Sequence, residues 1–101
     1  MVVTCNSLED VRQNIDRLDR QMVTLLAERG AYVAQAARFK KDTDAVKAPA
    51  RVEQVIAKVR ALAEGAGASP AVTEQVYRAM IAAFIEQELS EHARLAKTPT
   101  D

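Results

Sequence analysis

Cysteine, aromatic residues and long apolar runs are scarce in this sequence, and each scarcity excludes a class of protein. Cys5 is the only cysteine, so the chain cannot form an internal disulfide and has no cysteine cluster for a metal. No apolar run approaches the roughly 20 residues that a membrane-spanning helix needs, and the N-terminal part lacks the basic-then-apolar pattern of a secretory signal. We therefore expect a cytoplasmic protein in a reducing compartment.

An excess of charge of one sign is also lacking, because 14 Lys and Arg residues balance 14 Asp and Glu residues. No overall field favours nucleic acid or a membrane as partner, so an anion site must come from local clustering of cations. The sequence has no Cys-x-x-Cys pair, Gly-rich phosphate loop or Ser-His-Asp grouping. We expect neither a metal nor a cofactor, which leaves catalysis by positioning and electrostatics.

What the sequence does contain is an apolar stripe at alternating steps of three and four residues. It runs from Leu8 to Lys40 with no proline and only Gly30 inside, which predicts one long amphipathic helix. Such a helix would be roughly 50 Å long, whereas a compact domain of about 100 residues has a radius of gyration of about 13 Å. We therefore expect an intertwined homodimer that covers the stripe. Its members are Leu8, Val11, Ile15, Leu18, Met22, Leu25, Tyr32, Ala36 and Phe39.

Two shorter helices are predicted after the long one. Pro49 suits the first position of a helix, and Ser69 followed by Pro70 suits the start of another. With 101 residues and 49% apolar content, the chain is expected to be a single all-α domain spanning 1–101, without strands. The predicted elements are a long helix over 7–40, a loop over 41–48, a second helix over 49–64, a third helix over 70–95 and a frayed tail over 96–101.

Three cations of the predicted long helix are candidates for binding an anion. Arg29 interrupts the apolar stripe, where a guanidinium is tolerated only beside a counter-charge. Lys40 lies about 20° around the helix and roughly 16 Å along it from Arg29, so both side chains could lean towards one small ligand. Arg12 is about 25 Å from Arg29 and could contribute only from the second chain of an antiparallel dimer.

Three residues of the shorter helices complete this set of charged candidates. Arg51 stands in the first turn of the second helix, where a cation is unfavourable without a bound anion, although a solvated surface arginine is the alternative. Glu88 falls on the apolar face of the third helix, where burial favours its neutral, hydrogen-bond-donating form. The alternative for Glu88 is a salt bridge to Arg29 or Arg51. His92 is expected to be exposed near the end of that helix.

These motifs together resemble a known family. Arg12-x-x-Ile15-Asp16-x-Leu18-Asp19, then Leu25-Leu26-Ala27-Glu28-Arg29, and then Lys40 and Arg51 are similar in order and spacing to the all-helical chorismate mutases and the related isochorismate pyruvate lyases. The resemblance covers Leu8 to about Leu95. It implies an intertwined homodimer whose two sites each borrow one arginine from the other chain.

The resemblance also implies roles for the candidate residues. Arg29 and the partner chain's copy of Arg12 would hold the two carboxylates of the substrate, with Arg51 supporting the charged wall. Lys40 would hydrogen-bond the ether oxygen, where negative charge grows as the C–O bond breaks. Glu88 matches a position that contacts the same oxygen and would have to be protonated to do so.

Two substrate-binding positions depart from the mutase pattern. Val52 replaces a Glu that binds the ring hydroxyl in many bacterial mutases, and Phe84 replaces a small hydroxyl-bearing residue. The Arg51-Val52 pair and the Arg38-Phe39-Lys40 run are similar to the lyases, whereas Glu88 is more typical of the mutases.

The resemblance, taken with the charged candidate residues, implies a chorismate mutase that converts chorismate to prephenate. The first alternative is an isochorismate pyruvate lyase that forms salicylate and pyruvate. The second is a non-catalytic helical module for dimerisation or regulation, in which Arg29, Lys40 and Glu88 form a salt-bridge network. Under either enzymatic reading, the ligand is a small dianion.

Overall fold

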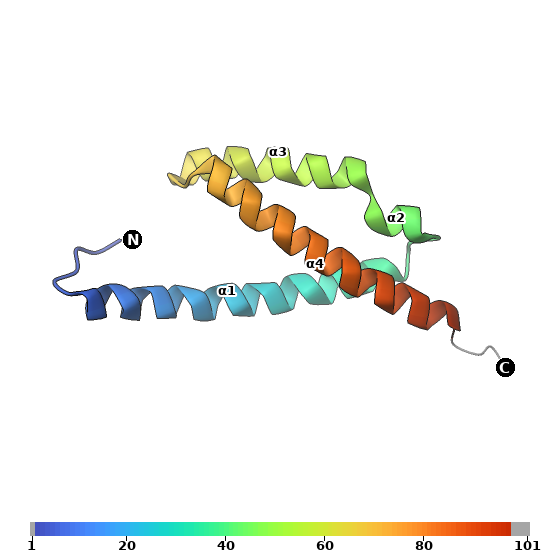
Figure 1. The fold of residues 1–101 in the computed structure, drawn as a ribbon, viewed down its shortest axis with the longest axis horizontal. Coiled ribbons are helices and arrows are strands. Elements are labelled where there is room, and N and C mark those ends of the chain that lie inside the picture. The colour runs from blue at the N-terminus through green and yellow to red at the C-terminus, as the bar shows by residue number, and fades with distance from the viewer. Residues whose placement is uncertain (1, 98–101) are drawn as a thin grey trace. The chain divides into compact units, whose positions relative to one another are not determined.

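The computed structural model describes residues 2–97 and confirms the all-α fold (Figure 1). Within those residues there are no strands. The chain divides into two compact units, Met1–Tyr32 and Val33–Asp101, and the division falls inside the first helix, so each unit is described by itself. The helices are α1 (Leu8–Ala37), α2 (Thr43–Lys47), α3 (Pro49–Ala66) and α4 (Pro70–Lys97).

Side-chain caps begin two of the long helices where the sequence predicts them. Ser7 Oγ accepts a hydrogen bond from the Asp10 backbone N–H at 3.0 Å, and Asp10 Oδ2 accepts one from the Asn6 N–H at 3.2 Å. Ser69 Oγ accepts from the Val72 N–H at 3.2 Å at the start of α4. These bonds satisfy backbone donors that have no partner inside the first helical turn.

The end of α1 differs from the prediction. The helix stops at Ala37, and the next backbone bonds run three residues back, from Arg38 N–H to Gln35 O at 3.1 Å and from Phe39 N–H to Ala36 O at 3.0 Å. Lys40 therefore lies in a turn beyond the helix. The helical angle predicted between Arg29 and Lys40 is wrong for this reason.

The segment predicted as a loop contains the short helix α2. Asp42 Oδ1 accepts a hydrogen bond from the Ala45 N–H at 2.9 Å, so this residue of the predicted loop caps a helix. Ala48 follows in the left-handed region with φ 35°, which is uncommon for a residue with a Cβ, and it separates α2 from α3.

The later helix ends also differ from the predicted limits. Helix α3 continues past Gly65 to Ala66 and is capped by Gly67 at φ 77°, where glycine carries no Cβ penalty. Helix α4 extends to Lys97, beyond the predicted limit of 95. The rest of the predicted tail, 98–101, lies outside the described residues.

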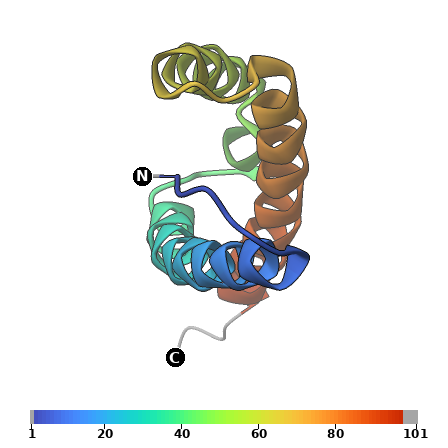
Figure 2. The same cartoon turned by 90° about the vertical axis from the view of Figure 1, so that its left-hand side faces the viewer.

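The core described for the chain lies in the second unit. There α3 and α4 lie side by side, and α2 contacts α4 (Figures 1 and 2). Apolar residues from the end of α1 and from the other three helices are excluded from solvent in this unit, which makes it the folded support for any site built on α4. The buried apolar residues are Ala37, Val46, Ile56, Val59, Ala63 and Ile81.

Replacing Ile56 by alanine should destabilise the protein by about 2–5 kcal/mol, because it deletes buried methyl groups and leaves a cavity. Urea unfolding at one fixed protein concentration measures the change. The matched control is Lys58→Ala on the exposed face of α3, which should change the unfolding free energy by less than about 0.5 kcal/mol. Equal effects of the two substitutions would show that α3 does not pack through Ile56.

An exposed ion-pair network also links α3 to α4. Arg78 donates to both oxygens of Glu53 at 3.0 Å and to Glu74 at 2.7 Å, and Arg60 donates to Glu74 at 2.6 Å. The hydrogen bonds from Arg78 lower the pKa of both Glu53 and Glu74 below the ordinary 4.5, with Arg60 adding to the effect at Glu74. The charged network therefore favours the folded state.

The lowered pKa values give the sign of a pH effect. The network's contribution is fully present above pH 4.5, the ordinary pKa of the carboxyls, and is lost as pH falls through their lower folded values. Arg78→Ala should therefore reduce the acid sensitivity of stability, by a small amount because the pairs are exposed. Thermal unfolding from neutral pH to pH 3 measures it, and an unchanged slope would contradict the assignment.

The first unit consists of most of α1 and a short segment, residues 2–7, that turns back over its start (Figure 2). Asn14 Nδ2 donates to the Asp10 backbone oxygen at 2.9 Å and also contacts Cys5 Sγ at 3.7 Å, which ties the segment to the helix. The apolar stripe of this unit is uncovered, with six side chains 40–62% exposed. They are Leu8, Val11, Ile15, Leu18, Met22 and Leu25. Separately, no helix among residues 2–97 has both the length and the apolar composition to cross a membrane.

Candidate active site

Lys40 and Glu88 form the most buried charged pair that the structure describes. Lys40 Nζ lies 2.7 Å from Glu88 Oε2, and the two side chains are 27% and 4% exposed. A carboxylate removed from water to this degree needs a counter-charge, and the ammonium supplies it. The unequal exposure means that solvent or a ligand can reach the lysine more readily than the glutamate.

The contact satisfies the charge of Glu88 but leaves its oxygen without a directed hydrogen bond. Oε2 is within ion-pair distance of Nζ, yet no donor among the described residues meets it with hydrogen-bond geometry. At this short distance the two groups form an ion pair, because Coulomb attraction depends weakly on angle. Buried acceptors are rarely left in this state, so Oε2 is a position where a hydrogen-bond donor of a ligand would be stabilised.

Helix α4 positions Glu88 in the way that the sequence predicts. Ile81 and Glu88 are seven residues apart, and both are buried on the helix. The predicted alternative for Glu88 was a salt bridge to Arg29 or Arg51, and the contact that the structure gives is with Lys40. The salt-bridge network predicted for the non-catalytic module includes a contact between Lys40 and Glu88, and the structure shows that contact.

His92 is the site residue that sequence reasoning missed. It is half-buried, and its Nε2 lies 2.9 Å from the backbone oxygen of Lys40, so the expectation of an exposed histidine is wrong. The available signal was its spacing, because His92 follows Glu88 by four residues and therefore lies on the same face of α4. The group that His92 contacts is a backbone oxygen, and a pattern of side chains in the sequence cannot predict a contact with the backbone.

The other predicted residues of this unit occupy the two helices that pack together. Arg51 is exposed in the first turn of α3, and Val52 beside it is half-buried. Phe84 is half-buried on α4, one helical turn before Glu88. Their roles in substrate binding stay predictions.

The two remaining predicted residues lie on α1 in the first unit. Arg12 is exposed, and Arg29 is half-buried. Both stay predictions for binding the carboxylates of a substrate.

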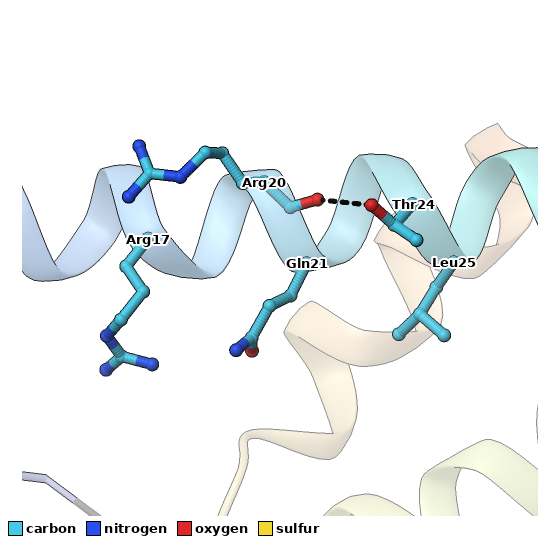
Figure 3. Close-up of a pocket in the computed structure, with 5 residues that line it drawn as sticks. All are labelled: Arg17, Arg20, Gln21, Thr24 and Leu25. Carbon is cyan, nitrogen blue, oxygen red and sulfur yellow. Dashed lines mark hydrogen bonds between the residues drawn. The ribbon is translucent and has the colours of Figure 1, made fainter.

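A shallow, open hollow on the surface of α1 contains none of the predicted site residues (Figure 3). Figure 3 shows Arg17, Gln21 and Leu25 pointing to the same side of the helix, whereas Arg20 points away. Thr24 Oγ1 donates back to the Arg20 carbonyl at 3.0 Å, which is a local helix contact. This surface has no arrangement of groups that indicates chemistry.

Comparison with known proteins adds two findings. The family model for chorismate mutase type II matches residues 11–89, a segment that contains every predicted site residue. A protein from Pseudomonas aeruginosa described as isochorismate pyruvate lyase is 33% identical over 85 residues, which cover 84% of each chain. The family model is named for the chorismate mutase reaction, whereas the relative is named for the isochorismate pyruvate lyase reaction.

Proposed function

The chain belongs to the chorismate mutase type II family, and from this premise we propose that it is an enzyme converting chorismate to prephenate. The observation that carries the proposal is the Lys40–Glu88 pair, a cation and an unsatisfied buried oxygen on adjoining elements. In this reaction the C–O ether bond breaks while a C–C bond forms within the same molecule. No cofactor or external nucleophile takes part.

Lys40 is proposed to stabilise charge on the breaking bond. As the ether bond lengthens, its oxygen gains negative charge, and an ammonium donor aimed at that oxygen lowers the barrier. Lys40 Nζ is partly exposed in the free protein, so it can exchange Glu88 Oε2 for the substrate oxygen. The Lys40 ammonium would then stabilise the ether oxygen in the transition state instead of the Glu88 carboxylate.

Glu88 is proposed to become protonated in the complex. Once Lys40 turns to the substrate, the buried carboxylate would face a dianion without its counter-charge, which favours the neutral form. A protonated Glu88 could then donate a second hydrogen bond to the ether oxygen. This proposal requires Glu88 to take up one proton when the substrate binds.

Activity should therefore rise as pH falls below neutral, and Glu88→Gln should flatten this dependence, because an amide donates at every pH. The measurement is kcat/KM against pH between about 5 and about 8, for wild type and variant. Gln87→Glu, on the exposed side of α4, is the control and should leave the wild-type profile unchanged. A Glu88→Gln profile that still rises towards acid would overturn the role given to Glu88.

The substrate's two carboxylates are proposed to bind arginines. Arg29 and Arg51 would come from one chain and Arg12 from the other chain of a homodimer. The uncovered stripe of α1 supports the dimer, since monomeric proteins rarely leave so continuous an apolar surface in water. The partner proposed for that surface is a second copy of the chain.

Isochorismate pyruvate lyase is the second candidate, favoured by two observations. The relative from Pseudomonas aeruginosa carries that description, and Val52 cannot accept a hydrogen bond from a ring hydroxyl as the glutamate of many mutases does. In the lyase reaction the same ether bond breaks, while a ring hydrogen moves to the enolpyruvyl methylene, so that isochorismate gives salicylate and pyruvate. Lys40 and Glu88 would act on the same oxygen.

Parallel incubations with chorismate and with isochorismate test the proposal. Prephenate formation with the higher kcat/KM supports the mutase, whereas faster formation of equal amounts of salicylate and pyruvate supports the lyase. Samples without enzyme correct for spontaneous reaction of both substrates. If the folded protein turns over neither substrate, both the mutase and the lyase proposals are overturned, and the non-catalytic helical module is favoured.

A further inference from the structure

One face of α4 holds Lys40 at two separate points. Glu88 Oε2 lies 2.7 Å from the side-chain Nζ, and His92 Nε2 lies 2.9 Å from the backbone oxygen of the same lysine. Glu88 and His92 are four residues apart, which places them one helical turn from each other on one side of the helix. Helix α4 therefore contacts both ends of the Lys40 residue.

The chemistry of the backbone contact fixes the direction of the hydrogen bond. A carbonyl oxygen can only accept, so Nε2 must carry the hydrogen. Both the neutral Nε2–H tautomer and the imidazolium form meet this requirement. Either form of the ring can therefore make the contact.

The Lys40 backbone needs such a contact because α1 no longer supports it. The helix ends at Ala37, and the bond from the Lys40 N–H to the Ala37 oxygen is long, at 3.4 Å. A lysine side chain adds several rotatable bonds to whatever freedom its backbone has. An ammonium aimed at a developing charge loses much of its effect when displaced by about 1 Å.

We infer that His92 is a positioning residue, which fixes the backbone of Lys40 so that the ammonium is aimed at the reacting oxygen. The inference deepens the proposed function and rests on it. His92 itself makes no contact with substrate in this scheme and acts only through Lys40. Its effect should therefore appear in the chemical step more than in substrate binding.

Removing the donor with His92→Leu should lower kcat about tenfold, because a less firmly held Lys40 ammonium stabilises the transition state less well, and should change KM by less than about twofold. His92→Gln retains an N–H close to the place of Nε2 and should recover most of kcat. Ser90→Ala, on an exposed position of the same helix, is the matched control and should behave as wild type. A His92→Leu enzyme with wild-type kcat would overturn the inference.

Amide hydrogen exchange tests the same contact without using activity. In His92→Leu, the amides of 39–42 should exchange about tenfold faster, while α3 amides keep their wild-type rates and His92→Gln stays close to wild type. Unchanged exchange at 39–42, or an equal increase throughout α3, would overturn the inference. If wild type turns over neither substrate but exchange changes as described, the proposed function fails while the contact that holds Lys40 stands.

Discussion

Replacing Lys40 by alanine is expected to reduce kcat/KM by about 100- to 1000-fold, the usual cost of removing one preorganised donor from a developing oxyanion. The reason is that the proposed reaction uses no cofactor or nucleophile, so the loss of charge stabilisation at the ether oxygen cannot be offset by other chemistry. Steady-state kinetics with chorismate and with isochorismate measure the loss. Lys41→Ala is the matched control, because Lys41 is the exposed neighbour in the same turn and should retain wild-type activity.

The same substitution also leaves Glu88 buried without its counter-charge, and that could cost about 3–5 kcal/mol of stability. The double variant Lys40→Ala/Glu88→Gln removes the unpaired charge and separates the two effects. It should unfold at a denaturant concentration closer to that of wild type and still be inactive. A folded double variant with kcat/KM within tenfold of wild type would contradict the catalytic role of Lys40.

Mixing two inactive variants, Arg12→Ala and Arg29→Ala, is expected to restore about a quarter of wild-type activity. With free exchange, about half of the dimers contain one chain of each kind, and one of the two sites in such a dimer has both arginines intact. The measurement is activity before and after exchange of an equimolar mixture, with chain exchange verified by mass spectrometry of the intact dimers.

The control mixes Arg12→Ala chains with Arg12→Ala/Arg29→Ala chains, which cannot generate an intact site in any pairing. It should stay inactive after the same exchange. Activity that remains at parental levels in the first mixture, despite verified heterodimers, would show that Arg12 does not act across the dimer. A protein that remains monomeric at every concentration would overturn the shared site itself.

The sequence predicted the three long helices well because their signals are local. Apolar spacing, the Ser7 and Ser69 caps and Pro49 act within a few residues of the positions that they determine. It failed at 38–48, where the apolar period fades and Asp42 can begin either a turn or a helix. The end of α1 at Ala37 is not marked by the local apolar spacing, and Ala37 is buried in the second unit.

The sequence by itself determined the family, the all-α class, and the selection of Lys40 and Glu88 as unusual charges, since these depend on composition, order and helical spacing. Only the tertiary structure decided that the two side chains meet at 2.7 Å and that His92 binds the lysine backbone. The physical reason is distance along the chain: 48 residues separate Lys40 from Glu88, and His92 lies 52 from its partner. Contacts at that separation form when α4 packs against the rest of its unit, and no periodicity of a single helix encodes them.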